Sequence, residues 1–350
     1  MFSTLVPLLF LALLAAAVAT LVVEAWRGDV VESEHLIHGA VCGTDGEVLA
    51  SWGDPFRVTY PRSSLKPLQA MAMVGLGAAD AFGLSEREIA IACASHSGEP
   101  FHLEAARSLL SKVGLNEGSL RCGPHRPAYG PEADALVRSG CEALPIHNNC
   151  SGKHSGMLAL ARHLGAPLET YLDIAHPVQQ EIIAHLSRLT GVPRESIRAG
   201  ADGCGAPTFA LPIAGAATAF ARLAAADTGT PEGDAAARRI TAAMMAHPEL
   251  IAGTGRFDTA LMRALTGSLF CKGGAEGFFC IGVPERKIGV ALKVADGTGR
   301  AREPAAVYIL QELGVLPEPV PAALAAFANP PVTNTARQVA GHIHVAGKRG

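Results

Sequence analysis

Strand-like segments at both ends of the chain enclose a long helical middle, and this order limits the possible folds. The strand-like segments are 21–26, 38–42, 48–52, 277–283, 288–294 and 342–345. Asp45-Gly46, between the second and third of them, is a strong tight-turn signal. We therefore predict an α+β fold within the wider α/β class, an antiparallel β-sheet flanked by helices with an α-rich layer, in which early and late strands are neighbours.

The middle of the chain repeats apolar residues at helical spacing. Ser85 and Glu88 form a capping-box pattern, which marks a helix start. The predicted helices cover residues 66–81, 85–94, 101–113, 155–164, 168–189, 208–225 and 234–246.

Composition excludes several classes of protein. With 350 residues, 49% of them hydrophobic and 17% charged, the chain can bury a sizeable core as one large or two smaller domains. The net charge of -3 comes with scattered Lys and Arg, so there is no basic stripe and we exclude nucleic acid as a partner. Eight cysteines are spread through the chain without the spacing of a disulfide scaffold.

Residues 1–20 form an apolar N-terminal extension that is set apart from the rest. Met1 to Val23 carries no charge and is long enough to span a bilayer or to serve as a signal peptide. A signal peptide needs a basic residue before its apolar stretch, and the first is Arg27. Two interpretations of residues 1–20 stay open, a signal or membrane anchor and a wrongly assigned start site. We expect a cytoplasmic protein, or an exported or membrane-anchored one if residues 1–20 are a real anchor.

Ser63 and Lys66 are three residues apart, a spacing that places both side chains on one face of a helix. Pro67 is tolerated only in the first helical turn, so the pair is expected at a helix N-terminus. Burial and the positive end of the helix dipole disfavour a lysine cation there, which allows Lys66 to act as the base for a Ser63 nucleophile. Ser-x-x-Lys is expected by chance about once in a chain of this length, and simple capping residues are the alternative.

Two further runs contain residues suited to the same chemistry. Ser95 lies in a polar run directly after an apolar segment, which is typical either of a functional loop or of an N-cap cluster. Lys272 precedes two glycines ahead of a predicted strand, so it can face a nucleophile from a sheet edge.

The runs 147–156 and 202–205 each contain a cysteine close to a glycine, with nitrogen donors nearby. Zinc favours thiolate and nitrogen ligands in four-coordinate geometry. The spacing matches no standard zinc knuckle, so small buried turns are the default interpretation and a metal site is the alternative.

Six segments together resemble the rhizobial-type asparaginases, which are distinct from the threonine-dependent asparaginases. They are YPRSSLK (60–66), SHSGE (95–99), HNNCSGKHSG (147–156), DGCG (202–205), GTGRFD (253–258) and CKGGAEG (271–277). The resemblance spans about residues 21–345 in the same order and leaves out the N-terminal extension. It implies an asparaginase-like catalytic domain at 21–350, with a fold similar to serine β-lactamases and glutaminases. It also implies hydrolysis of L-asparagine to L-aspartate and ammonia, by a protein that is usually a homodimer.

The resemblance also assigns roles to single residues. It implies two Ser-Lys tandems as the catalytic groups, Ser63 with Lys66 and Ser95 with Lys272. It implies one zinc ion per chain, which helps to position the substrate, with the ligands Cys150, Lys153 and Cys204. It places three further residues near the substrate, namely Arg62, His154 and Asp202. A lysine ligand must lose its proton, so zinc affinity should depend on pH.

Two other classes of protein stay open. Penicillin-binding proteins and β-lactamases also use Ser-x-x-Lys and a lysine-glycine strand, but their Ser-Asp-Asn and Lys-Thr-Gly partners are absent. A non-catalytic amino-acid-binding module would bind asparagine and release no ammonia. Our expectation is that Ser63 attacks the side-chain amide and Lys66 accepts its proton, with Ser95 and Lys272 tuning the proton network.

Overall fold

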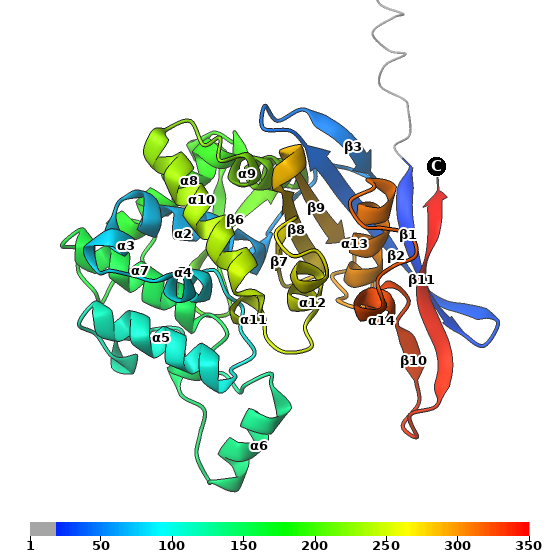
Figure 1. Cartoon of the computed structure of the whole chain (residues 1–350), viewed down its shortest axis with the longest axis horizontal. Helices are drawn as coiled ribbons and strands as arrows, with labels where there is room; N and C mark the ends of the chain where they lie inside the picture. The colour runs from blue at the N-terminus through cyan, green and yellow to red at the C-terminus, as the bar shows by residue number, and fades with distance from the viewer. Residues whose placement is uncertain (1–18, 350) are drawn as a thin grey trace, which may run out of the picture.

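A computed structural model, which describes residues 19–349, contains an eight-stranded antiparallel sheet with helices packed beside it (Figure 1). The strand order is β10-β11-β1-β2-β9-β8-β7, and β3 pairs with β2. The strands are β1 (Thr20–Arg27), β2 (Val30–Cys42), β3 (Val48–Trp52), β7 (Phe270–Gly273), β8 (Phe278–Val283), β9 (Ile288–Val294), β10 (Pro331–Thr333) and β11 (Val339–Arg349).

The sheet joins the two ends of the chain, as predicted. Leu21 of β1 lies opposite Lys348 of β11, and Ile37 of β2 lies opposite Val294 of β9. The predicted hairpins are present as β2–β3 and β8–β9, and the short helix η5 (Pro284–Arg286) forms the second turn. The predicted fold class, an antiparallel sheet flanked by helices, is confirmed.

Helices cover both faces of this sheet. On one face α9 (Ile213–Ala225) approaches β9 so closely that a Cβ at Gly289 would lie 1.9 Å from the Ala217 carbonyl oxygen. On the other face α13 (Arg302–Glu312) lies near Gly39 of β2, where a Cβ would lie 3.8 Å from Ile309 Cδ1. Glycine at the first position is therefore required by the packing, because any side chain would push helix and sheet apart.

An α-rich layer lies beyond α9, and its predicted helices are present with shifted ends (Figure 1). Its members are α2 (Lys66–Gly75), α3 (Ala78–Ala81), α4 (Glu86–Ala92), α5 (Pro100–Lys112), α7 (Ser151–His163), α8 (Pro177–Thr190) and α10 (Pro231–Ala246). The largest shift is that of the helix predicted at 168–189, which starts only at Pro177. The predicted helix 66–81 is interrupted at Gly77, whose φ of 83° is left-handed. The capping box at Ser85 and Glu88 is confirmed. The remaining short elements are α11 (Pro248–Ile251), α12 (Phe257–Ala264), α14 (Ala325–Ala328), η1 (Arg62–Leu65), η2 (Glu117–Ser119), η3 (Pro145–His147), η4 (Arg194–Ser196) and η6 (Ala322–Leu324).

The prediction of one helix over 208–225 is wrong at its N-terminal end. Residues Pro207–Pro212 form strand β6, which pairs with β4 (Val58–Thr59) and β5 (Arg198–Ala201) in a three-stranded sheet, and α9 starts only at Ile213. A short, fully buried apolar run has no clear period, so strand and helix cannot be told apart locally. The partner strands decided the outcome.

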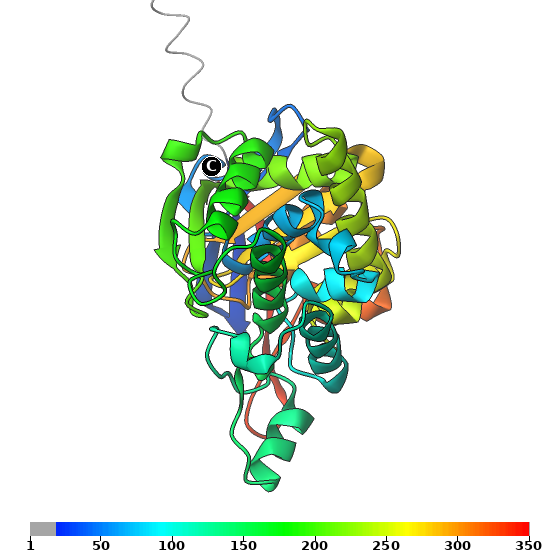
Figure 2. The ribbon, with the colours of Figure 1, turned by 90° about the vertical axis from the view of Figure 1, so that its left-hand side faces the viewer.

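One segment projects from the body of the molecule. Helix α6 (Gly130–Arg138) extends away from the remaining helices in both views (Figures 1 and 2). At the base of this segment the Tyr129 amide donates to the Ser97 carbonyl at 2.9 Å. The projecting segment is thus fixed to the chain directly after Ser95.

The predicted extension 1–20 lies outside the described residues except for Ala19 and Thr20, and Thr20 begins β1. Within residues 19–349 no helix is long and apolar enough to cross a membrane.

Candidate active site

A cavity of about 190 Å³ lies where η1, β7, the loop after α4 and the starts of α12 and α13 meet. These elements come from separate parts of the sequence, between Ser63 and Arg302. The polar residues that line the cavity are Ser63, Ser95, His96, Asn149, Arg256, Asp258, Lys272 and Arg302. The walls between them are formed by glycine and alanine, which leaves room for a small ligand.

Ser63 enters this cavity from the turn that precedes α2. It lies in η1, which continues into α2, and Pro67 occupies the first turn as expected. The preceding residue, Arg62, has a φ of 53°, a left-handed conformation that costs free energy for a residue with a side chain. Such strain concentrates at functional sites, and here it sets the direction from which Ser63 enters the cavity.

The turn that carries Ser63 is tied to strand β7. The Ser64 hydroxyl donates to the Lys272 carbonyl at 2.8 Å. A Cβ at Gly274 would lie 2.3 Å from the Pro61 carbonyl oxygen, so only glycine permits this approach. The tie holds the hydroxyl of Ser63 and the amine of Lys272 in the same cavity.

Lys66 is buried below the cavity and reaches Ser95. Its Nζ donates to the Ser95 hydroxyl at 2.8 Å, to the Ala94 carbonyl at 2.6 Å and to the Asn149 carbonyl at 3.3 Å. No hydrogen bond joins Lys66 to Ser63 within residues 19–349. The structure therefore brings the lysine of the first expected tandem against the serine of the second.

Lys272 is the second buried lysine of the site, with 1% of its surface exposed. Its Nζ donates to the Gly273 carbonyl at 2.7 Å. Burial is the largest cause that lowers the pKa of Lys272 to about 7, and the positive charges of Lys66 and Arg256 add to this shift. The Asp258 carboxylate opposes the shift but does not outweigh it. A large fraction of Lys272 is therefore uncharged at neutral pH and can accept a proton.

Asp258 is the acidic residue of the cavity lining. It is 2% exposed, and its Oδ1 accepts the Gly273 amide at 2.6 Å. Burial raises the pKa of Asp258, but Lys272, Arg302 and the Gly273 amide together hold it below its usual value. Asp258 therefore stays a carboxylate and fixes the end of β7 beside Lys272.

His96 lines the cavity beside Ser95. Its Nε2 lies 2.8 Å from the Ser151 hydroxyl, and its ring stacks on His102 at 5.1 Å between centroids. Burial lowers the pKa of His96 well below its usual value, and the neighbouring His102 adds to this effect. The imidazole is therefore neutral, and within the described chain its Nδ1 is buried without a hydrogen-bond partner.

The three residues expected to hold zinc lie together. Lys153 Nζ donates to Cys204 Sγ at 3.0 Å. A hydrogen bond between the two thiols lowers the pKa of Cys150 well below its usual value and raises that of Cys204, while burial opposes the first shift and adds to the second. Burial lowers the pKa of Lys153, but Cys150, Cys204 and Asp202 outweigh it and the pKa is raised. A Cys150 thiolate beside a Lys153 ammonium results.

The two thiols and the lysine nitrogen are donors of the kind that zinc accepts. Ligand atoms around a tetrahedral zinc lie about 3.5 Å apart, close to the observed separation of Lys153 Nζ and Cys204 Sγ. Within residues 19–349 no group of three or more His, Cys, Asp or Glu side chains forms a metal site, so any site here depends on the lysine. Zinc would have to displace a proton from Lys153.

Asp202 links this cluster to the turn of Ser63. Its Oδ1 accepts from Arg62 Nη2 at 2.6 Å and from Arg62 Nε at 2.9 Å, while its Oδ2 lies 3.9 Å from Lys153 Nζ. Burial raises the pKa of Asp202, but Lys153 and Arg62 outweigh it, so the carboxylate stays charged. The strained Arg62 is thereby anchored to the Cys-Lys-Cys cluster.

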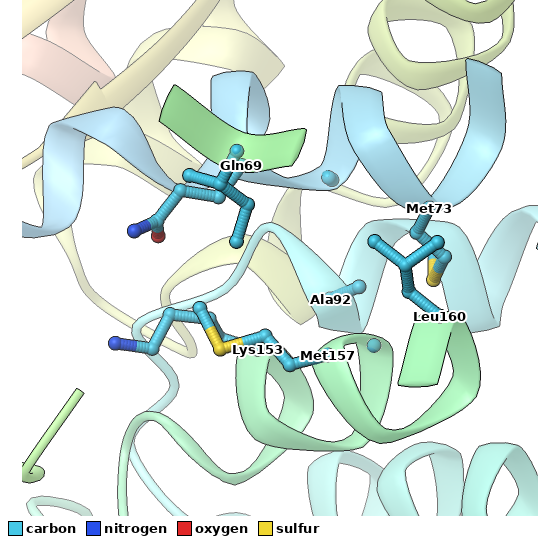
Figure 3. Close-up of a pocket in the computed structure, with 9 residues that line it drawn as sticks. Gln69, Met73, Ala92, Lys153, Met157 and Leu160 are labelled. Carbon is cyan, nitrogen blue, oxygen red and sulfur yellow. The ribbon is translucent and has the colours of Figure 1, made fainter. Parts of the chain in front are cut away.

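The stem of Lys153 crosses an apolar space between α2, α7 and α8. Figure 3 shows the Lys153 amine and the Gln69 amide pointing the same way, away from Met73 and Leu160. The space has a volume of about 10 Å³, room for about one water. The stem packs against apolar side chains, and the buried amine is paired with Cys204, which allows Lys153 to be 4% exposed although it carries a charge.

His154 lies behind the site. It is fully buried on α7, and its Nδ1 lies 2.6 Å from the Tyr171 hydroxyl. Burial lowers the pKa of His154 well below its usual value, with Lys153 and Lys66 adding to the effect. His154 is absent from the cavity lining, and so are Arg62 and Asp202.

The structure thus separates the expected residues into two groups. Ser63, Ser95 and Lys272 line the cavity, and Lys66 reaches it through Ser95. The second group lies outside the lining and comprises Arg62, Cys150, Lys153, His154, Asp202 and Cys204. Sequence reasoning gave no role to five polar lining residues, His96, Asn149, Arg256, Asp258 and Arg302. The first four lie inside quoted motifs, whereas Arg302 had no signal.

Comparison with known proteins identifies the family. A family model described as L-asparaginase II matches residues 23–345, and the chain belongs to this family. Membership supports an amidohydrolase-type function. No curated protein gives a significant sequence match.

Solved structures with related folds are distant. A β-lactamase from Mycobacterium bovis is 16% identical with a TM-score of 0.39, and the match covers 79% of this chain and 94% of the other. The structure of Mglu in its native form is 13% identical with a TM-score of 0.44, and the match covers 81% of this chain and 62% of the other. These values add nothing to the architecture described above.

Proposed function

We propose that the protein hydrolyses L-asparagine to L-aspartate and ammonia through an acyl-enzyme on Ser63. The observation that carries this proposal is the cavity in which Ser63, Ser95 and Lys272 meet, with Lys66 bonded to Ser95. A serine hydroxyl beside buried amines is the arrangement of an activated nucleophile. Membership of the L-asparaginase II family supports the substrate.

The first proton transfer is assigned to Lys272. The sequence favoured Lys66 as the base, but Lys272 has a pKa of about 7 as a result of burial and lines the same cavity as Ser63. As the Ser63 oxygen bonds to the side-chain amide carbon, its proton moves to the Lys272 amine. The same proton then passes to the leaving nitrogen, and ammonia departs as the carbon-nitrogen bond breaks.

Water then hydrolyses the acyl-enzyme, and the same groups exchange the proton in the reverse direction. The water oxygen attacks the ester carbon and gives a proton to Lys272, and the Ser63 oxygen leaves and recovers that proton. Lys66 and Ser95 form the neighbouring hydrogen-bonded pair, which positions the water or relays the proton.

Zinc is proposed as a structural and positioning ion held by Cys150, Lys153 and Cys204. A bound zinc would supply a fixed positive charge in place of the Lys153 ammonium. The residues themselves already connect this cluster to the active site, since Asp202 contacts both Lys153 and Arg62. The homodimer that the family resemblance implies stays a prediction.

The test measures ammonia release from L-asparagine by the purified full chain and by Ser63→Ala. We expect the variant to lose the burst of ammonia in a single turnover, and Ser268→Ala, an exposed serine ahead of β7, to keep it. Parental ammonia release from Ser63→Ala would refute the nucleophile. Turnover of nitrocefin without turnover of asparagine would indicate a β-lactamase. Binding of asparagine without release of ammonia would indicate a binding module.

A further inference from the structure

The ionisable side chains of the catalytic cavity are mostly basic. Arg256, Arg302 and Lys272 line it as basic groups, and Asp258 is the acidic group of the lining. Lys66 adds a further basic group through its contact with Ser95. Such a cavity attracts an anionic group, because a buried charge is stable only when it is paired.

Most of these basic groups are already committed. Lys66 donates to three oxygens, and Lys272 donates to the Gly273 carbonyl. Arg302 donates through Nη1 to the Gly274 carbonyl and through Nη2 to Glu303, and its guanidinium lies over the Phe279 ring. These contacts orient Lys66, Lys272 and Arg302 toward protein oxygens. The three side chains are therefore poor candidates for binding a ligand anion.

Arg256 differs from them. Its side chain is exposed at the cavity, and no hydrogen bond or ion pair from its guanidinium is found anywhere in residues 19–349. A guanidinium with no protein partner is free to form a two-point contact with a carboxylate, which is its preferred planar partner.

The backbone beside Arg256 is held in place. The Glu99 carboxylate accepts the Thr254 amide at 2.8 Å and the Thr254 hydroxyl at 2.6 Å. A Cβ at Gly253 would lie 1.9 Å from Ser97 Oγ, so the loop is packed directly on the segment that follows Ser95. Arg256 is thus presented at a fixed place at the cavity, next to the residues of the proposed reaction.

We infer that Arg256 binds the α-carboxylate of the amino-acid substrate and thereby restricts the enzyme to amides that carry one. The inference rests on the proposed function, and it concerns specificity and not bond cleavage. L-asparagine carries its α-carboxylate at the end opposite the amide, so anchoring it at Arg256 leaves the amide to reach Ser63. Asp258 is the acidic residue of the same lining, and its carboxylate suits the α-ammonium group.

The test compares two amides that differ only in this carboxylate, L-asparagine and 3-aminopropanamide. We expect Arg256→Gln to lower kcat/KM for L-asparagine by about 10- to 100-fold, chiefly through KM, and to leave 3-aminopropanamide unchanged. Arg263→Gln is the matched control, because Arg263 lies on α12, the helix that starts directly after Arg256, and pairs with Glu249 outside the cavity. Equal losses on both amides, or no loss on L-asparagine, overturn the inference.

Calorimetric titration separates this inference from the proposed function. L-aspartate and 3-aminopropanoate differ only in the α-carboxylate, and their binding requires no catalysis. We expect the parent chain to prefer L-aspartate by about 10-fold or more and Arg256→Gln to lose that preference. A parent chain that releases no ammonia refutes the hydrolase, whereas an unchanged preference in Arg256→Gln, or no preference in the parent, overturns the role of Arg256.

Discussion

Replacing Lys272 by methionine should stabilise the folded protein at neutral pH while it abolishes catalysis. Burial lowers the pKa of Lys272 from 10.5 to about 7. This difference of about 3.5 pH units, at about 1.4 kcal/mol per unit, corresponds to about 5 kcal/mol of destabilisation. Methionine has a similar shape and no charge, so it removes this cost. The Gly273 carbonyl loses its donor in exchange, at a cost of about 1 kcal/mol.

The sign of the pH dependence follows from the lowered pKa. Between pH 7 and 10.5 the unfolded chain keeps Lys272 protonated, whereas the folded chain holds it neutral, so unfolding takes up a proton. The contribution of this group to stability therefore rises with pH across that window. Methionine does not titrate, and the advantage of Lys272→Met over the parent should fall by about 2 kcal/mol between pH 7 and pH 9.

Urea unfolding of both chains at pH 7 and pH 9 measures this difference directly. Lys287→Met is the matched control, because Lys287 is exposed at the turn between β8 and β9 and should give no pH-dependent difference. A constant difference between Lys272→Met and the parent at the two pH values would refute the reasoning. The reasoning would also be refuted if Lys272→Met were less stable than the parent at both pH values.

Three further outcomes are expected. The kcat/KM for L-asparagine should rise with pH through a midpoint near 7, the pKa to which burial lowers Lys272, and a profile flat from pH 6 to 8 would exclude that base. Gly274→Ala should lower the free energy of unfolding by about 1–3 kcal/mol and remove most of the activity, since its Cβ would lie 2.3 Å from the Pro61 carbonyl oxygen. Gly299→Ala is the control and should cost little, because there is open space around Gly299. Zinc should raise the thermal midpoint of the parent more at pH 8 than at pH 6, because a ligand lysine must lose its proton, and Cys204→Ser should abolish the shift.

Local signals in the sequence predicted much of the fold. The Asp45-Gly46 turn and the Ser85 capping box each depend on a few neighbouring residues, and both are found where expected. The run 208–212 gave no such signal, because a buried apolar segment satisfies helix and strand equally well. Its strand form depends on pairing with Arg198–Ala201, just before it in the chain, and with Val58–Thr59, which lies far away in the sequence.

The sequence by itself determined which side chains are available for chemistry, since Ser63, Ser95, Lys66 and Lys272 all lie in motifs that are visible in the chain. Only the tertiary structure decided how they pair. Lys66 contacts Ser95 across 29 residues, and the pKa of Lys272 is lowered by burial against strands and helices from elsewhere. Hydrogen-bond partners and desolvation depend on the folded surroundings of a group, so spacing along the chain could name these residues without assigning their roles.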